Sequence, residues 1–137
     1  MDNRQCILIV DDDQDVLKLL NDTLETEGFD TVVVADGDSA LTLLQDIDPD
    51  LVILDTTMPG FDGYQTLDLI REQSNVPVIM LSASYEAASL QKALSLGADD
   101  YVKKPFSTRS LMARIQAKLR RARQEVLQSP EKKTGSF

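Results

Sequence analysis

The stretch that decides the fold is LVILDTTMPGFDG, residues 51–63. Its first four residues, Leu51 to Leu54, form a continuous apolar run, which is the pattern of a strand buried on both faces in a parallel sheet. The turn-forming sequence MPGFDG follows, so the strand ends at Asp55. Open α/β sheets place their ligand sites at this carboxyl edge. Asp55 is therefore a candidate site residue, although the local pattern alone fits a strand end or a helix cap equally well.

The length and composition fit one globular domain. The chain has 137 residues, of which 42% are hydrophobic and 27% are charged. No apolar run approaches the ~20 residues that a membrane span requires, and the first residues do not resemble a signal peptide. We therefore expect a cytoplasmic protein with no membrane partner. The single Cys6 excludes an internal disulfide, and because the chain has no histidine we predict a small buried side chain rather than a metal ligand.

Charge is divided unequally along the chain. Residues 1–106 hold 21 acidic and 6 basic side chains, whereas residues 107–137 hold 8 basic and 2 acidic ones. An acidic body repels nucleic acid, so we expect no direct nucleic-acid binding by this domain. The basic segment is interpreted as a solvated helix face.

The rest of the chain repeats the pattern of a strand followed by a helix. Apolar runs predict strands at residues 6–10, 31–35, 51–54, 76–81 and 101–103. Amphipathic stripes predict helices that begin after Asp13, at Asp38 or Ser39, near Tyr64, near Ala87, and at Ser107 or Thr108. Five such units predict an α/β fold with a doubly wound, five-stranded parallel sheet.

The end of the chain changes character. The last apolar stripe continues to Val126, and from Gln128 the sequence QSPEKKTGSF loses its periodicity and gains Pro, Gly, Lys and Ser. We expect a domain over residues 1–124 and a flexible linker or tail over residues 125–137. The tail stands where an output domain absent from this sequence would begin.

Polar side chains gather at the carboxyl edge of the predicted sheet. Asp11 and Asp12 end the first strand, Asp55 ends the third, and Ser82 and Lys104 follow the fourth and fifth. Three converging carboxylates repel one another by several kcal/mol at an effective dielectric near 20. Mg²⁺ is the natural counter-ion, because it prefers oxygen ligands and also accepts phosphate oxygens. Such a site suits phosphoryl transfer to a carboxylate, which needs no general base.

Four motifs also resemble those of a known family. They are ILIVDDD (7–13), LVILD with MPGFDG (51–63), VIMLSA (78–83) and GADDYVKKPF (97–106). Together, over roughly residues 6–124, they resemble the receiver domain of bacterial two-component response regulators. The resemblance implies a flavodoxin-like (βα)5 fold with strand order 2-1-3-4-5.

The resemblance also implies roles for single residues. Asp55 would be the phosphoacceptor for a sensor histidine kinase. Asp11 and Asp12, with Asp55 and the backbone carbonyl of Thr57, would hold Mg²⁺, and Lys104 would contact the phosphoryl group.

A second set of implied roles concerns the response to phosphorylation. Ser82 would be the switch hydroxyl and Tyr101 the switch aromatic side chain, and Pro105 would follow a cis peptide bond. The fourth helix, fifth strand and fifth helix would form the output face, through which we expect a homodimer. The domain would be a signalling switch rather than an enzyme, and its output is expected to be transcription.

Three alternatives stay open at this point. A receiver acting alone through protein contacts would need no output domain, and a degenerate receiver would bind partners without phosphorylation. A phosphatase of the haloacid dehalogenase type also uses a strand-end aspartate with Mg²⁺. That chemistry requires a second aspartate two residues later, where this chain has Thr57.

Overall fold

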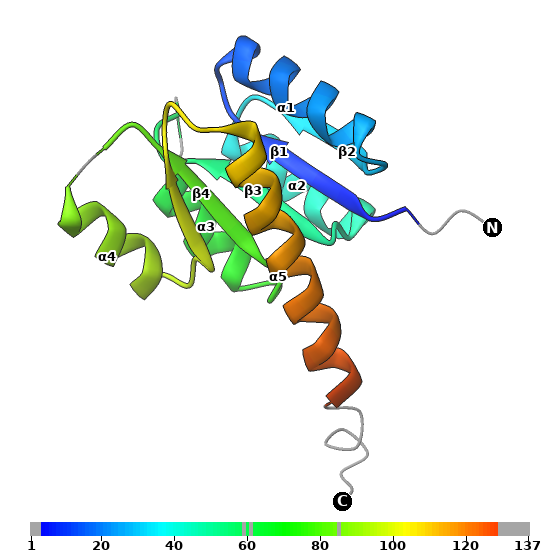
Figure 1. The fold of residues 1–137 in the computed structure, drawn as a ribbon. Coiled ribbons are helices and arrows are strands. Elements are labelled where there is room, and N and C mark those ends of the chain that lie inside the picture. Colours follow the sequence, from blue (N-terminus) through cyan, green and yellow to red (C-terminus); the bar gives the residue numbers. More distant parts are fainter. Residues whose placement is uncertain (1–3, 59, 61, 85, 129–137) are drawn as a thin grey trace, which may run out of the picture.

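The protein is a five-stranded parallel sheet covered by helices on both faces (Figure 1). The computed structural model describes residues 4–58, 60, 62–84 and 86–128. The strands are β1 (Cys6–Val10), β2 (Asp30–Val34), β3 (Leu51–Asp55), β4 (Val78–Ser82) and β5 (Asp100–Lys103). The helices are α1 (Gln14–Thr26), α2 (Gly37–Ile47), α3 (Gly63–Arg71), α4 (Ala87–Ser95) and α5 (Thr108–Gln128). The strand order β2-β1-β3-β4-β5 confirms the predicted topology.

The sheet separates two hydrophobic clusters. Side chains alternate between the two faces of a strand, so Ile7 and Ile9 pack with α1 and α5 while Leu8 and Val10 pack with the helices on the opposite face. Every residue of β3 and of β4 is buried, as expected for central strands between two helix layers. The apolar run at Leu51 to Leu54 is therefore the middle of the core.

The topology creates a switch point at the carboxyl edge of the sheet. The chain runs from β1 to β2 on one side and then crosses back to β3 on the other side of β1. The order reverses at this point, and ligands of open α/β sheets bind at such a switch point, outside the carboxyl ends of the strands. The register pairs Val10 with Leu54, so the residues that follow β1 and those that end β3 lie side by side.

Local sequence signals fix several element ends. The Asp13 carboxylate accepts hydrogen bonds from the backbone of Asp15 and Val16 and caps α1, as predicted. The second helix begins earlier than predicted, because Asp36 rather than Asp38 or Ser39 is its cap. The Asp36 carboxylate accepts from the Ser39 backbone at 2.7 Å.

Two other predicted elements differ in extent. β4 starts at Val78 instead of Val76, since Pro77 has no N–H to donate and the Val76 carbonyl bonds to Arg71 instead. The helix α5 runs to Gln128, through the first residues of the segment expected to be a tail. The remainder of that segment, residues 129–137, lies outside the described residues.

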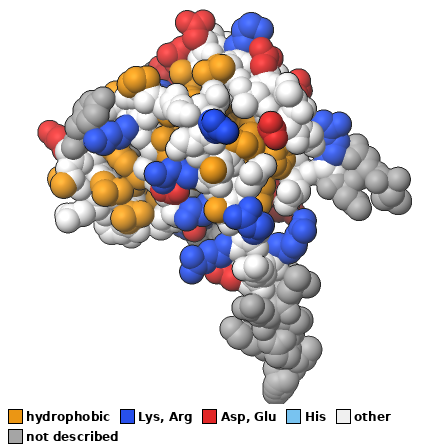
Figure 2. Space-filling view, viewed as in Figure 1, with side chains coloured by type: hydrophobic (Ala, Val, Ile, Leu, Met, Phe, Trp, Pro, Cys, Tyr) orange, Lys and Arg blue, Asp and Glu red, His pale blue; other side chains and the backbone are white. Residues whose placement is uncertain are grey.

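The predicted apolar stripe of the fourth helix is not a core face. Of the residues of α4, all of which the structure describes, only Ala93 is buried. Leu90 is 39% exposed and Leu94 is 49% exposed. Figure 2 shows hydrophobic side chains at the left of the molecule, where α4 lies, and Lys and Arg side chains near the place where α5 leaves the body.

Two smaller expectations have clear outcomes. Cys6 begins β1 but is only partly buried, and its burial together with the nearby Asp50 and Asp30 raises the pKa of the thiol. The Lys104–Pro105 peptide bond is cis, as the resemblance implied. Within the described part of the chain, the helices are all too short or too polar to cross a bilayer.

Candidate functional site

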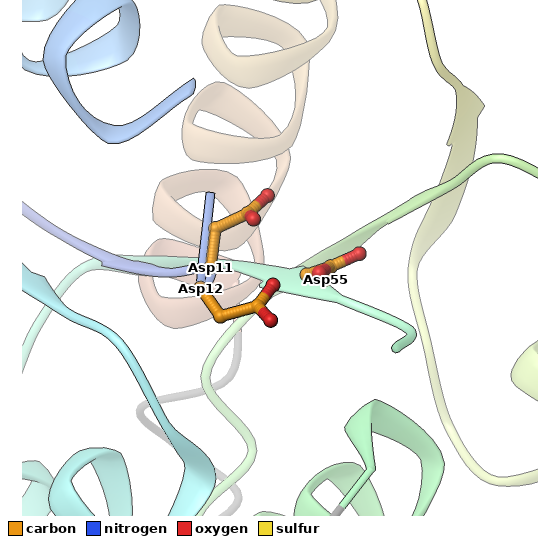
Figure 3. Close-up of side chains that lie close together, drawn as sticks. All are labelled: Asp11, Asp12 and Asp55. Carbon is orange, nitrogen blue, oxygen red and sulfur yellow. The ribbon is translucent and has the colours of Figure 1, made fainter. Parts of the chain in front are cut away.

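Three aspartates meet at the carboxyl edge of the sheet. The carboxylates of Asp11, Asp12 and Asp55 lie close together in Figure 3, each offering an oxygen within 4.8 Å of the others. Asp11 is fully buried and Asp55 is 4% exposed, whereas Asp12 is exposed. The strand ends thus place two charges inside the protein and one at the opening of the pocket.

The loop after Asp55 is fixed by close backbone packing. The Gly63 amide donates to the Thr56 carbonyl at 2.9 Å, and a Cβ at position 63 would lie 2.0 Å from the Asp55 carbonyl oxygen. Only glycine allows the start of α3 to approach β3 so closely. Asp62 and Gln65 form a capping box that holds this start in place. Gly63, the last residue of MPGFDG, therefore fixes the position of α3 against β3. The turn-forming pattern of the sequence did not indicate this role.

Lys104 links the two buried carboxylates. Its Nζ lies 2.9 Å from Asp11 Oδ2 and 3.3 Å from Asp55 Oδ1. The other oxygen of Asp11 accepts from the Asp13 amide at 2.9 Å. The Lys104 contact with Asp11 is an ion pair outside hydrogen-bond geometry, so within the described residues Asp11 Oδ2 is buried without a hydrogen-bond partner. Lys104 supplies one positive charge for these two buried carboxylates, so negative charge remains uncompensated.

The surroundings of Asp55 favour its protonated, neutral form. Burial and the neighbouring Asp11 raise the pKa of Asp55 to about 6, against the opposing effects of Lys104 and the Thr57 amide. Burial on its own would lower the pKa of Lys104, but Asp11 and Asp55 outweigh it and raise the pKa. One lysine therefore faces three carboxylates, and the excess negative charge favours binding of a cation.

The donor set fits Mg²⁺. Three carboxylates converge, the two buried ones share one lysine, and hard divalent cations prefer oxygen ligands. This acidic triad is typical of the magnesium site of receiver domains. Thr57 is exposed beside Asp55, and the role of its carbonyl as a ligand stays a prediction.

Ser82 lies at the end of β4 and is buried. Its hydroxyl accepts from the Ser84 amide at 3.0 Å, so it bonds to its own loop, and no bond to Asp55 occurs among the described residues. The backbone carbonyl of Ser82 accepts a hydrogen bond from the Lys104 amide at 2.8 Å. This bond fixes the position of the Lys104 backbone beside the pocket.

Tyr101 lies on β5 with its ring against the core. Its hydroxyl is buried. Tyr64 of α3 packs against the same cluster, and burial, followed by the proximity of Tyr101, raises the pKa of Tyr64. Lys92 of α4 lies 4.5 Å from the centre of the Tyr64 ring. The sequence reasoning placed Tyr64 in an apolar stripe and missed this contact between α3, α4 and β5.

The fold and the acidic pocket define a class of signalling domain, and comparison with known proteins agrees. The model of the response regulator receiver domain matches residues 7–116. The chain therefore belongs to the receiver domain family of two-component systems. Receiver domains are signalling modules rather than enzymes, and they work with histidine kinases.

The relatives extend the comparison. The DNA-binding response regulator MtrA of Mycolicibacterium smegmatis is 45% identical over 122 residues, which are 89% of this chain and 54% of that protein. A probable transcriptional regulator, ycf27 of Cyanophora paradoxa, is 44% identical over 125 residues, or 91% of this chain and 52% of that protein. The chain thus spans about half the length of the curated relatives it matches.

Solved structures share the same fold. The receiver domain of the Francisella response regulator 1452 has a TM-score of 0.83 at 35% identity and covers 87% of this chain and 99% of its own. The BeF3-activated receiver domain of Klebsiella pneumoniae RstA has a TM-score of 0.81 at 33% identity, with coverages of 85% and 99%.

Proposed function

We propose that this chain is a cytoplasmic, phosphorylation-dependent switch in which Asp55 accepts a phosphoryl group from a sensor histidine kinase. The observation that carries the proposal is the buried Asp55 carboxylate, paired with Lys104 and within 4.8 Å of the Asp11 and Asp12 carboxylates. Asp55 is the proposed reacting group because it ends the central strand at the switch point, whereas Asp11, which also contacts the lysine, is completely buried.

In the proposed phosphoryl transfer, Asp55 is the nucleophile and Lys104 is the neighbouring cation. An Asp55 oxygen attacks phosphorus in line, the new O–P bond forms as the P–N bond to the donor imidazole breaks, and the departing nitrogen keeps the electron pair. Lys104 neutralises charge on the phosphoryl oxygens. Asp11, Asp12, Asp55 and the Thr57 carbonyl would hold Mg²⁺, which when bound supplies positive charge to the same oxygens.

The response follows from the new charge. A phosphoryl group on Asp55 brings acceptor oxygens to which the Ser82 hydroxyl and Lys104 are drawn. Ser82 would then leave the Ser84 amide that it now accepts from, and the loop after β4 would rearrange. Tyr101 on β5 would change its packing with this loop and with α4.

The output surface is the face formed by α4, β5 and α5, and a homodimer through this face is the proposed active form. Leu90 and Leu94 expose apolar surface there. The curated relatives are a DNA-binding regulator and a probable transcriptional regulator, so the output is proposed to be transcription. The alternative output is direct protein contact by a receiver that acts alone.

Intact mass measurement tests the proposal. The chain is incubated with acetyl phosphate with and without Mg²⁺, and we expect a Mg²⁺-dependent gain of one phosphoryl group. The gain should be lost in Asp55→Asn and kept in Asp68→Asn, which changes an exposed aspartate of α3. A missing gain, or a gain that persists in Asp55→Asn, would overturn the phosphoacceptor assignment and favour the degenerate scaffold.

Size-exclusion chromatography of the same samples separates the outputs. A dimer formed only by the phosphorylated chain supports the proposed active form. A phosphorylated chain that stays monomeric favours the receiver that acts alone.

A further inference from the structure

The helix α4 is attached to the body differently at its two ends. It lies at the margin of the molecule, away from α5 (Figure 1), and buries only Ala93. A helix with so little buried surface owes its position to a few contacts, which are those of Ala93, the contact of Lys92 with Tyr64 and the contacts at its two ends. Those contacts therefore decide how it can move.

The C-terminal end of α4 is held by one guanidinium group. Arg71, the last residue of α3, donates from Nε to the Gly97 carbonyl at 3.0 Å, just beyond α4. Its Nη1 donates to the carbonyls of Ser74 and Val76 at 3.2 and 2.7 Å, and its Nη2 pairs with Asp99 at 3.0 Å. The Arg71 side chain is only 19% exposed. Four acceptors on two loops are thus bound by a planar group whose donor geometry a lysine cannot reproduce.

The partners of Arg71 are themselves fixed. The Asp99 carboxylate oxygen that pairs with Arg71 also accepts from the Val78 amide at 2.8 Å, at the start of β4. Gly97 has a φ of 104°, and a Cβ there would lie 3.0 Å from Arg71 Nε. The arginine therefore ties α3, β4 and the turn after α4 into one unit.

The N-terminal end of α4 has weaker ties. Glu86 stands at the cap position but makes no side-chain cap hydrogen bond. The Ser84 and Ser89 hydroxyls lie 3.0 Å apart, and the Ser84 amide donates to the Ser82 hydroxyl. One link at this end consequently runs through Ser82, the group that the phosphoryl group would draw away.

We propose that Arg71 is a positioning residue that fixes the C-terminal turn of α4, so that phosphorylation moves the N-terminal half of α4 about this turn. The inference rests on the proposed function of Asp55. The serine contacts release one end of the helix while the arginine holds the other. The exposed Leu90 then changes position relative to β5, and the turn at Gly97 does not.

Backbone amides at the two ends report the movement separately. The amides of Leu96, Gly97 and Ala98 donate to the carbonyls of Lys92, Leu94 and Ala93 at 3.0–3.1 Å, so their hydrogen exchange measures the order of the fixed turn. The Ser89 and Leu90 amides both donate to the Glu86 carbonyl at 3.1 and 3.4 Å and report the other end.

Hydrogen exchange with mass spectrometry is measured on the full chain with Mg²⁺, before and after acetyl phosphate. In the wild type, phosphorylation should change exchange over residues 86–92 and leave residues 95–99 unchanged. Arg71→Lys keeps the charge opposite Asp99 but loses the carbonyl contacts. Before phosphorylation it should speed exchange at residues 95–99 by roughly tenfold or more, as expected from one lost charged hydrogen bond. After phosphorylation the change should spread to residues 95–99.

Lys18→Gln is the control, because Lys18 forms an exposed ion pair with Asp22 at 3.3 Å on α1, away from α4 and from the proposed dimer face. It should keep the wild-type pattern. A phosphorylated wild type whose exchange changes equally at both ends, or an Arg71→Lys chain with the wild-type pattern, overturns the inference alone. A wild type without a gain in intact mass overturns the proposed function and this inference together.

Discussion

Burial of the Asp55 carboxylate lowers the stability of the folded chain by an amount that depends on pH. Burial, followed by the neighbouring Asp11, raises the pKa of Asp55 from 3.8 to about 6, although Lys104 acts in the opposite direction. The folded chain therefore binds a proton more tightly than the unfolded chain does. Stability contributed by this proton is lost as pH rises from about 4 to about 6.

Replacing the charge should stabilise the protein. Asp55→Asn, measured in EDTA by urea unfolding, should raise the free energy of unfolding by on the order of 2 kcal/mol at pH 7.5. The gain should be small at pH 4, where the folded wild type carries the proton. Asp68→Asn serves as the control and should show no such pH-dependent gain. A gain at pH 4 that equals the gain at pH 7.5 would contradict this account.

Gly63 gives a second prediction at this scale. Gly63→Ala places a Cβ 2.0 Å from the Asp55 carbonyl oxygen, so the backbone must shift at a cost of about 3 kcal/mol. We expect lower stability by thermal unfolding and slower phosphorylation by acetyl phosphate. Gly60→Ala is the comparison, since Gly60 has a φ of 77° but open space around its Cα. Gly63 is not among the glycines with positive φ, so a Gly63→Ala chain as stable as the wild type would contradict the role of the close approach.

Some of the residues discussed above could be predicted from the sequence, and others could not. The strand-end positions of Asp11, Asp55 and Lys104 were predictable, because the carboxyl ends of parallel strands share one edge, and the structure brings these side chains together. The contacts of Arg71 were not predictable. Three of its four acceptors are backbone carbonyls, which every residue has, so the sequence carries no sign of them.

At the level of elements, α4 is the helix whose burial the sequence misjudged. The spacing of Leu90, Ala93 and Leu94 is that of a core face, yet the two leucines are exposed. Periodicity identifies a helix with an apolar side and does not say whether that side meets the core or a partner. The other strands and helices were predicted in the correct order, with ends displaced by one or two residues where a cap or a proline decided the boundary.

Substitutions on the exposed side of α4 should therefore have little effect on the stability of the monomer but should weaken the dimer. Leu94→Ser is expected to change the free energy of unfolding by less than about 0.5 kcal/mol, whereas Leu67→Ala in the buried face of α3 should cost about 3 kcal/mol. Sedimentation of phosphorylated Leu94→Ser should show weaker dimerisation than the wild type. Full dimerisation of that variant would place the interface elsewhere.

For the whole molecule, three carboxylates converge in the pocket, whereas exposed basic side chains gather on α5. Arg120, Arg121 and Arg123 are exposed on α5, in the region where Figure 2 shows basic side chains below the body. The acidic pocket makes folding sensitive to divalent cations, because an ion that binds only the folded chain stabilises it by mass action.

Magnesium should raise the unfolding temperature. At ten times its dissociation constant, Mg²⁺ should add about 1.4 kcal/mol to the free energy of unfolding of the wild type. Asp12→Asn removes one carboxylate of the triad and should require more Mg²⁺ for the same effect. Asp15→Asn, at the exposed start of α1, is the control and should respond as the wild type does. An identical response in all three chains would place the bound ion outside the pocket.

The complete burial of β3 and β4 has a consequence for how long the pocket survives as the protein is warmed. Strands at the centre of a sheet open only when the whole domain unfolds, while a marginal helix frays earlier. Asp55 ends one of these strands and Ser82 the other, so the reacting end of the molecule shares the lifetime of the fold. On heating, α4 should lose order at temperatures where Asp55 still accepts a phosphoryl group.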